Sequence, residues 1–202
     1  MVHKHSPTPE QVQELLKDEE VRISLTHCGD WDYFLSQLTN ELSRKCPFCQ
    51  VDEKKNKSLD GSNKYWRVQR SKFPKKHSEI HLLIVPRRHI THIKELTIRE
   101  WVALLRAGWW VLKNFDLAGG GIIWRFGSLK YTAASVRHSH VNIIVPNLQG
   151  EIRDPLAKTP AKVRENDTRL EFFLSHVLAG TAPDETWKKH MERLKLSFEK
   201  KD

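Results

Sequence analysis

The chain has 202 residues, of which 39% are hydrophobic, a length and composition that suit a folded domain and exclude a wholly disordered protein. Its 34 basic and 25 acidic residues give a formal net charge of +9. No apolar run is long enough to span a bilayer, and the N-terminus lacks the apolar core of a signal peptide. We therefore expect a cytoplasmic protein that binds no membrane.

The basic charge is concentrated in one stretch of the chain. Residues 44–77 hold eleven Lys or Arg and three Asp or Glu, a local excess of +8. Such a stretch attracts anions, whether nucleotides, nucleic acid or polyphosphate. A solvated loop whose charge only aids solubility would have the same composition, and charge alone does not distinguish a mononucleotide from a strand of RNA.

The order of predicted elements is helices, then strands with one long helix among them, then helices. A capping box formed by Thr97 and Glu100 predicts the start of the long helix, which extends to Phe115. We expect helices at 8–19, 30–42 (capped by Asp30), 98–115, 160–179 and 183–199, strands at 65–71, 79–86, 122–127 and 136–146, a short strand within 151–156, and a loop at 128–135. This order predicts an α+β fold with an antiparallel sheet and a long crossing helix.

The segment "HSHVN" places polar residues at alternate positions of a predicted strand. In a strand, His138, His140 and Asn142 would point to one side, roughly 6.6 Å apart per step. The apolar residues between and after them would point into a core. Polar decoration of a half-exposed strand would give the same spacing, so the spacing alone does not establish a site.

Two cysteines indicate a metal or redox role. Cys46 and Cys49 form a C-x-x-C pair, whose two thiolates can both reach one tetrahedral ion. A redox pair or two separate thiols would look the same. If the ion is zinc, two more ligands are needed, and composition does not choose among the candidate imidazoles of His77, His81, His89, His92, His138 and His140.

The same strand offers groups for nucleophilic chemistry at phosphorus. A histidine whose Nδ1 is held by a hydrogen bond presents Nε2 as a nucleophile and can form a covalent phosphoramidate. The amide of Asn142 and the hydroxyl of Ser135 could donate hydrogen bonds to phosphoryl oxygens.

Several motifs together resemble the histidine triad superfamily of nucleotide hydrolases and transferases. "HLLIVPRRHI" at 81–90 precedes "SVRHSHVNIIVP" at 135–146 by about fifty residues, and both resemble the paired motifs of that family. "GGGIIWRFGSLKYTAASV" between them is similar to its glycine-containing strand and phosphate loop, and "CPFC" to the cysteine pair of its zinc-bearing members. The resemblance covers about 46–156. It implies one domain over 1–202 with this core, N-terminal helices in 1–45 and C-terminal helices in 157–202.

The resemblance assigns roles to individual residues. It implies that His140 is the nucleophile that takes up the nucleoside monophosphate, and that His81 is a further active-site histidine. It also implies a structural zinc ion held by four side chains, those of Cys46, Cys49, His89 and His138.

The third position of the motif departs from the family, because it is Asn142 where the usual residue is histidine. The galactose-1-phosphate uridylyltransferase branch has an amide there, so the departure favours nucleotidyl transfer or phosphorolysis over simple phosphoramidate hydrolysis. Arg125 and Ala134 also replace the family's Asn and Gln, so some ribose or phosphate contacts must differ. Arg125 could bind polyphosphate or form a surface ion pair.

The resemblance therefore implies a homodimeric nucleotidyl hydrolase or transferase acting on a purine nucleotide, either a dinucleoside polyphosphate or an adenylate, through a nucleotidyl-histidine intermediate. Two alternatives stay open. The first is a nucleic-acid-processing relative that removes adenylate from DNA or RNA ends. The second is a zinc-containing nucleotide-binding module without turnover.

Overall fold

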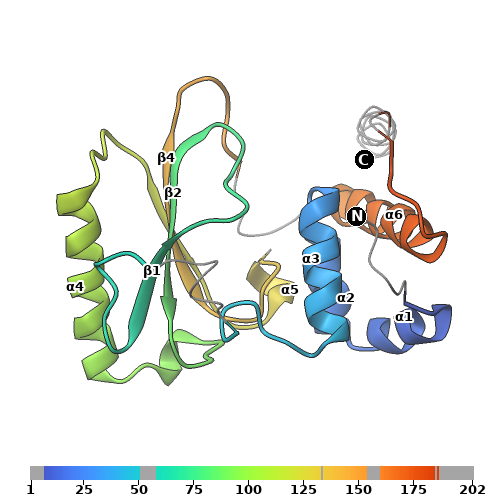
Figure 1. Cartoon of the computed structure of the whole chain (residues 1–202), viewed down its shortest axis with the longest axis horizontal. Coiled ribbons are helices and arrows are strands. Elements are labelled where there is room, and N and C mark those ends of the chain that lie inside the picture. Colours follow the sequence, from blue (N-terminus) through green and yellow to red (C-terminus); the bar gives the residue numbers. More distant parts are fainter. Residues whose placement is uncertain (1–6, 51–57, 133, 154–159, 185, 187–202) are drawn as a thin grey trace. The chain divides into compact units, whose positions relative to one another are not determined.

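The computed structural model describes residues 7–50, 58–132, 134–153, 160–184 and 186. The chain forms two compact units. Their helices and strands are labelled in Figure 1. We call residues 45–132 and 136–156 the sheet unit, and residues 1–44, 133–135 and 157–202 the helical unit. That residues 1–202 act as a single domain stays a prediction.

The sheet unit contains a four-stranded antiparallel sheet with a long helix on one face (Figure 1). The strand order is β1-β2-β4-β3. The strands are β1 Trp66–Arg70, β2 Ser78–Pro86, β3 Gly121–Arg125 and β4 His140–Pro146, and the helices are η1 Ile93–Glu95, α4 Ile98–Asn114 and α5 Leu129–Thr132. This arrangement confirms the predicted α+β fold with an antiparallel sheet and a long crossing helix.

The two faces of the sheet differ in chemistry because side chains alternate along each strand. Val141 and Ile143 of β4 pack with Ile84 of β2 against Ala107 and other residues of α4. Consequently His140 and Asn142 lie on the opposite face from α4. Apolar burial against α4 thus fixes which face of β4 carries the polar residues.

The N-terminus of α4 is held by a capping box that also binds an arginine. Thr97 Oγ1 accepts a hydrogen bond from the backbone N–H of Glu100 at 3.3 Å, and Glu100 Oε2 accepts one from the backbone N–H of Thr97 at 2.8 Å. Arg88, which follows β2, donates from Nε to Glu100 Oε1 at 2.6 Å. The Arg88 guanidinium, together with Thr97, lowers the pKa of the Glu100 carboxyl to about 2.

We expect Glu100→Gln to lower the free energy of unfolding at pH 7 by about 1–2 kcal/mol, because it removes the negative charge that strengthens the bond with Arg88, while the amide oxygen of glutamine can still accept from Thr97. A folded-state pKa below the unfolded value stabilises the protein above pH 4.5, and this contribution is lost as the pH falls toward 2. Urea unfolding at several pH values should therefore show a difference between wild type and variant that shrinks below pH 4.5. A difference that stays constant down to pH 2.5 would contradict this account.

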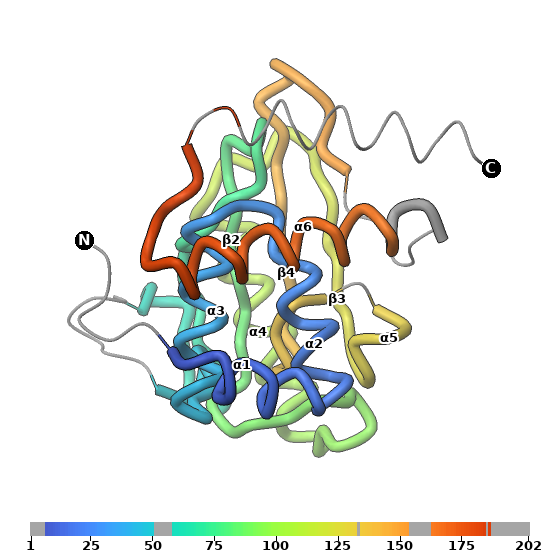
Figure 2. Tube along the Cα trace, turned by 90° about the vertical axis from the view of Figure 1, so that its right-hand side faces the viewer, coloured from blue at the N-terminus to red at the C-terminus, as the bar shows by residue number. Residues whose placement is uncertain are grey.

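In the part of the helical unit that the structure describes, four helices surround an apolar core of their own. They are α1 Pro9–Leu16, α2 Glu19–Thr26, α3 Trp31–Leu42 and α6 Pro160–Leu178 (Figure 2). Phe34 of α3 packs against Phe173 of α6 with ring centroids 5.0 Å apart, and both side chains are fully buried, as are Leu25 and Cys28. No helix in the described part of the chain is long and apolar enough to cross a membrane.

Several element boundaries differ from the predicted ones. The helix predicted at 8–19 ends at Leu16, and a separate helix, α2, begins at Glu19 because Asp18 caps it. Strand β4 begins at His140, so His138 precedes the strand instead of lying on it. Residues 129–132 of the predicted loop form α5, and residues 151–153 are not a strand. Most of the helix predicted at 183–199 lies outside the described residues. The helices predicted at 30–42, 98–115 and 160–179 are confirmed within one or two residues at each end.

Candidate active site and metal centre

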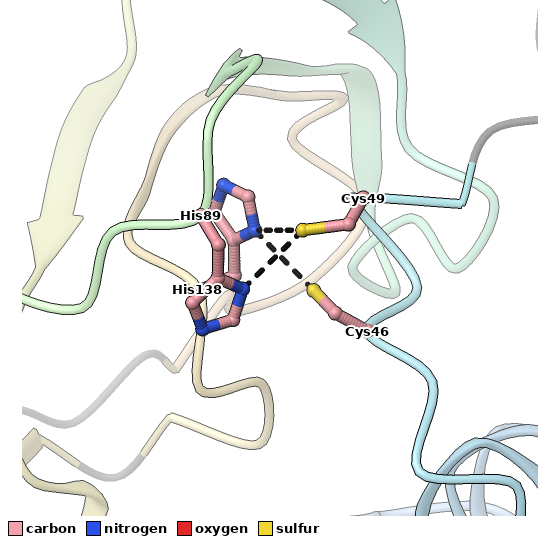
Figure 3. Close-up of side chains that lie close together, drawn as sticks. All are labelled: Cys46, Cys49, His89 and His138. Carbon is pink, nitrogen blue, oxygen red and sulfur yellow. Dashed lines mark hydrogen bonds between the residues drawn. The ribbon is translucent and has the colours of Figure 1, made fainter.

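Four predicted ligand side chains lie together in the sheet unit. Cys46 and Cys49 come from the turn before β1, His89 from the segment after β2, and His138 from the segment before β4 (Figure 3). Their ligand atoms all lie within 4.8 Å of one another. Nδ1 of His138 is 3.3 Å from Cys46 Sγ and 3.5 Å from Cys49 Sγ, while Nδ1 of His89 is 3.3 Å from Cys49 Sγ.

The ring of His138 is oriented by a backbone carbonyl. Its Nε2–H donates to the carbonyl oxygen of Pro86 at 3.0 Å, which leaves the lone pair on Nδ1, the atom that faces the two cysteines. A histidine ligand usually donates its other ring N–H to a backbone or carboxylate oxygen in this way. Burial, followed by the neighbouring His89, lowers the pKa of His138 to about 3, so the ring is neutral at physiological pH.

The donor set fits a zinc ion. In a tetrahedral site with zinc–sulfur bonds near 2.3 Å and zinc–nitrogen bonds near 2.0 Å, ligand atoms lie roughly 3.3–3.8 Å apart. The three sulfur–nitrogen distances of 3.3, 3.5 and 3.3 Å fall in this range. Without an ion, burial and then the hydrogen bond with Cys46 raise the pKa of the Cys49 thiol to about 11. A bound divalent cation would reverse that effect and hold both sulfurs as thiolates. Four protein ligands would close the site, which is typical of a structural zinc.

His140 lies two residues beyond His138, at the first position of β4, and its ring is also oriented by the backbone. Nδ1–H of His140 donates to the carbonyl oxygen of His138 at 2.8 Å. In the neutral ring the lone pair is then on Nε2, the nitrogen that a nucleophilic histidine uses. The four-residue Cys–His cluster and the candidate nucleophile are thus linked through the main chain of one short segment.

His81 and Asn142 form a hydrogen-bonded pair across β2 and β4. His81 Nδ1 accepts from the backbone N–H of Lys75 at 3.1 Å, which places the ring proton on Nε2. Nε2–H then donates to Asn142 Oδ1 at 3.0 Å. Because the oxygen of Asn142 is occupied by His81, its NH₂ group points toward β3, where it is 3.4 Å from the carbonyl oxygen of Ile123. His81 thus fixes which end of the Asn142 amide can meet a ligand.

The two remaining predicted phosphate ligands lie in different units. Arg125 is directly opposite His140 in the β3–β4 ladder, so its side chain leaves the same face of the sheet. Ser135 belongs to the helical unit, where its hydroxyl forms a hydrogen bond with the hydroxyl of Tyr33. The structure brings His81, His140, Asn142 and Arg125 to one face of the sheet.

One residue at the site was not predicted. Phe48, between the two cysteines, places its ring 4.8 Å from the ring of His140 and 5.6 Å from that of His138. Its carbonyl oxygen accepts a hydrogen bond from Arg67 Nη2 at 2.9 Å, which anchors the turn to β1. The only signal in the sequence was the apolar residue inside the C-x-x-C pair, which does not by itself indicate a contact with the histidines.

No protein-family model and no curated protein sequence matches the chain. Solved structures do resemble it. One is a histidine triad family hydrolase from Clostridium thermocellum, with 20% identity over 52% of this chain and 94% of that one, and a TM-score of 0.40. Another is diadenosine triphosphate hydrolase from Plasmodium falciparum, with 18% identity over 65% of this chain and 82% of that one, and a TM-score of 0.39.

A third is a zinc-bound histidine triad family protein from Mycobacterium smegmatis, with 17% identity over 68% of this chain and 98% of that one, and a TM-score of 0.40. The Clostridium and Mycobacterium structures are named as members of the histidine triad family, the family that the sequence motifs of this chain resemble.

Proposed function

We propose that the chain is a histidine triad nucleotidyl hydrolase or transferase that acts on a purine nucleotide through a nucleotidyl-His140 intermediate. The observation that carries the proposal is the bond from His140 Nδ1–H to the carbonyl oxygen of His138, which puts the lone pair of the neutral ring on Nε2. A fixed ring with its lone pair on Nε2 is what attack on phosphorus requires.

The first step forms one bond and breaks one. Nε2 of His140 attacks the α-phosphorus, the P–N bond forms, and the P–O or P–N bond to the leaving group breaks with its electron pair going to that group. The ring gains a positive charge, which the carbonyl oxygen of His138 stabilises by accepting from Nδ1–H. Water or inorganic phosphate then attacks phosphorus, breaks the bond to Nε2, and restores the neutral ring.

Neighbouring groups on the same face would stabilise the phosphoryl oxygens. The NH₂ group of Asn142, directed by His81, would donate a hydrogen bond, and the guanidinium of Arg125 would supply positive charge. Ser135 is proposed as a further phosphate ligand on the family resemblance. Zinc held by the four-residue cluster of Cys46, Cys49, His89 and His138 would be structural. Through His138 it would fix the backbone segment that immediately precedes His140.

A second candidate is the removal of adenylate from a nucleic-acid end. The turn between β1 and β2 supports it, because Lys72 and Lys76 are exposed there on either side of Phe73, whose side chain is 38% exposed. Lysines and an exposed aromatic ring are the groups that bind the backbone and bases of a single strand.

Product analysis distinguishes these activities. With a diadenosine polyphosphate, AMP formed without added phosphate indicates a hydrolase, and ADP formed only with phosphate indicates a phosphorylase. AMP released only from a 5′-adenylated oligonucleotide would favour the nucleic-acid activity. If no substrate gives product while nucleotide still binds, the proposal of turnover fails and a binding module remains.

We also propose that the protein is a homodimer, as the family resemblance implies. Large apolar side chains are exposed along α4 at alternating spacings of four and three residues, and one helix face with this spacing suits contact with a second helix. They are Ile98 (78% exposed), Val102 (44%), Leu105 (70%), Trp109 (60%) and Leu112 (56%).

Leu105→Asp should convert the dimer to a monomer, because the change places a charge at the centre of this face. Light scattering after size exclusion would measure the mass, with a chain mass of 23.7 kDa as the reference. Leu148→Asp, at an apolar residue 89% exposed in a loop, is the matched control and should leave the dimer intact. A wild-type protein that is monomeric at high micromolar concentration would refute the dimer.

A further inference from the structure

Ser139, the residue between His138 and His140, is held by three hydrogen bonds although it lies outside any helix or strand. Its backbone N–H donates to the carbonyl oxygen of Ile90 at 2.8 Å. Its hydroxyl accepts from Nε1–H of Trp124 at 2.7 Å and donates to the carbonyl oxygen of Arg125 at 3.1 Å. Ser139 is 4% exposed, and it belongs to the sheet unit together with its three partners. Both the backbone and the side chain of Ser139 are therefore fixed within that unit.

The ring of Trp124 is in turn held by two other tryptophans. Its centroid lies 6.1 Å from that of Trp66 in β1 and 5.2 Å from that of Trp101 in α4. Trp124 packs on the α4-facing side of the sheet, against the apolar core that includes Val141. The N–H of a tryptophan packed in this way usually needs a hydrogen-bond acceptor. The hydroxyl of Ser139 supplies one, at a position where the alternation continued by Val141 would favour an apolar residue.

The peptide group between His138 and Ser139 connects these contacts to the candidate nucleophile. Its N–H donates to Ile90, and its carbonyl oxygen accepts from Nδ1–H of His140 at 2.8 Å. A peptide group is planar, so a hydrogen bond on its N–H also fixes the direction of its carbonyl. That carbonyl orients the ring of His140, so the direction of Nε2 depends on how firmly the peptide group is held.

We propose that Ser139 and Trp124 are positioning residues for His140, which act by fixing the peptide group that orients its ring. The effect on catalysis rests on the proposed function, whereas the hold on the peptide group does not. Neither residue would touch the nucleotide, because Trp124 lies on the α4-facing side of the sheet and His140 on the other. Their effect would be on how often the His140 ring is in place to attack.

Ser139→Ala and Trp124→Phe test the proposal. The first removes the hydroxyl, and the second removes the indole N–H while keeping an aromatic ring among the tryptophans. A double variant with both changes tests whether the indole acts through the hydroxyl, because two groups in one hydrogen bond should not have independent effects.

Two variants in the same unit serve as matched controls. Ser62→Ala also removes a hydroxyl with two hydrogen bonds, which join it to the backbone N–H and carbonyl oxygen of Val68 at 2.9 and 3.3 Å. Trp110→Phe makes the second change on α4, where the ring centroid of Trp110 is 6.0 Å from that of Phe115. Both controls should lower the unfolding temperature without an effect on kcat, because neither residue contacts the 138–139 peptide group through a hydrogen bond of its own side chain.

Two measurements apply to every variant, well below its unfolding temperature. The first is the protection of the residue-139 amide against hydrogen exchange, corrected for the intrinsic exchange rate and divided by the protection of Ile84 in the interior strand β2. The second is the separate determination of kcat and KM with a diadenosine polyphosphate.

In Ser139→Ala and Trp124→Phe, the relative protection should fall several-fold. The value of kcat should fall about tenfold with KM changed less than about twofold, since a misplaced nucleophile reacts more slowly without binding less substrate. The double variant should lose about as much kcat as the more affected single variant. The controls should match wild type in relative protection and kcat.

Relative protection equal to that of the controls would overturn the hold on the peptide group, whatever the activity. Three results would overturn the positioning role: reduced protection with unchanged kcat, an equal fall in kcat in Ser62→Ala, or a loss in the double variant equal to the product of the single losses. A wild type without turnover would refute the proposed function, while the exchange measurement would still decide whether Ser139 and Trp124 hold the peptide group.

Discussion

Replacing His140 with alanine should lower kcat/KM by about 10⁴-fold or more, because the variant has no group that can form the nucleotidyl intermediate. Most of this loss in kcat/KM should come from a lower kcat. The contacts proposed for nucleotide binding, from Asn142 and Arg125, remain in the variant, so KM should change little. Steady-state assays with a diadenosine polyphosphate would measure both constants.

His176→Ala, in α6 of the helical unit, is the control and should retain wild-type kcat/KM. The His140 variant should also retain its metal and its unfolding temperature, because His140 is not a member of the four-residue cluster. Residual activity in the His140 variant within tenfold of wild type would mean that another group attacks phosphorus. Parallel losses of activity and metal would mean that His140 acts through the metal centre instead.

Removal of the metal should be the largest single effect on stability. We expect about one zinc ion per chain, bound by a site that is absent in the unfolded protein. A ligand that binds only the folded state stabilises it by about 4 kcal/mol when its free concentration is a thousand times its Kd. Cys46→Ser should therefore lose the metal and unfold at a lower temperature, and a strong chelator should produce the same shift in wild type.

Cys28→Ala is the matched control, because Cys28 is the third cysteine and lies in the core of the helical unit. This variant should keep its zinc, as measured by metal analysis of the purified protein, even if the change in the core costs some stability. Retention of metal in Cys46→Ser together with loss in Cys28→Ala would remove the assignment of the metal site.

The sequence predicted the elements that carry strong local signals. The capping box of Thr97 and Glu100 marked the start of α4, and Asp30 marked that of α3, because capping depends on residues three positions apart. The alternation of apolar residues in 141–145 correctly separated the α4-facing side of β4 from the polar side. In each case the structure is determined either by contacts between residues a few positions apart or by the alternation of apolar residues along one strand.

The boundary between α1 and α2 was missed although its signal was present. Asp18 accepts hydrogen bonds from the backbone N–H groups of Glu20 and Val21, at 2.9 and 3.2 Å, and so begins a new helix. The charged residues around Asp18 are also good helix formers, so composition favoured one continuous helix. A capping aspartate followed by two glutamates was the more informative pattern.

The position of His138 depends on tertiary contacts, which cannot be predicted from the spacing of apolar and polar residues. Strand spacing predicted that it would share a face of one strand with His140. Instead β4 begins at His140, opposite Arg125, while the backbone N–H of Ser139 donates to the carbonyl oxygen of Ile90. His138 is thereby outside the ladder and can reach the two cysteines.

Composition alone likewise does not select the candidate metal ligands, because the chain has eleven histidines. Family resemblance selected His89 and His138, and these are the two that the fold places beside Cys46 and Cys49. The contacts of Tyr33 and Gln37 with Ser135 join residues about one hundred positions apart in the sequence. Such contacts leave no pattern in a single sequence.

The central claim is that His140 carries the nucleotide covalently, and intact mass spectrometry of an acid-free quenched reaction tests it most directly. With a diadenosine polyphosphate, wild-type protein should gain the mass of one adenylyl group, and His140→Ala should gain none. A peptide map should place the added mass on His140. An adduct that persists in His140→Ala, or product formed by wild type with no adduct at any time on the millisecond scale, would contradict the account.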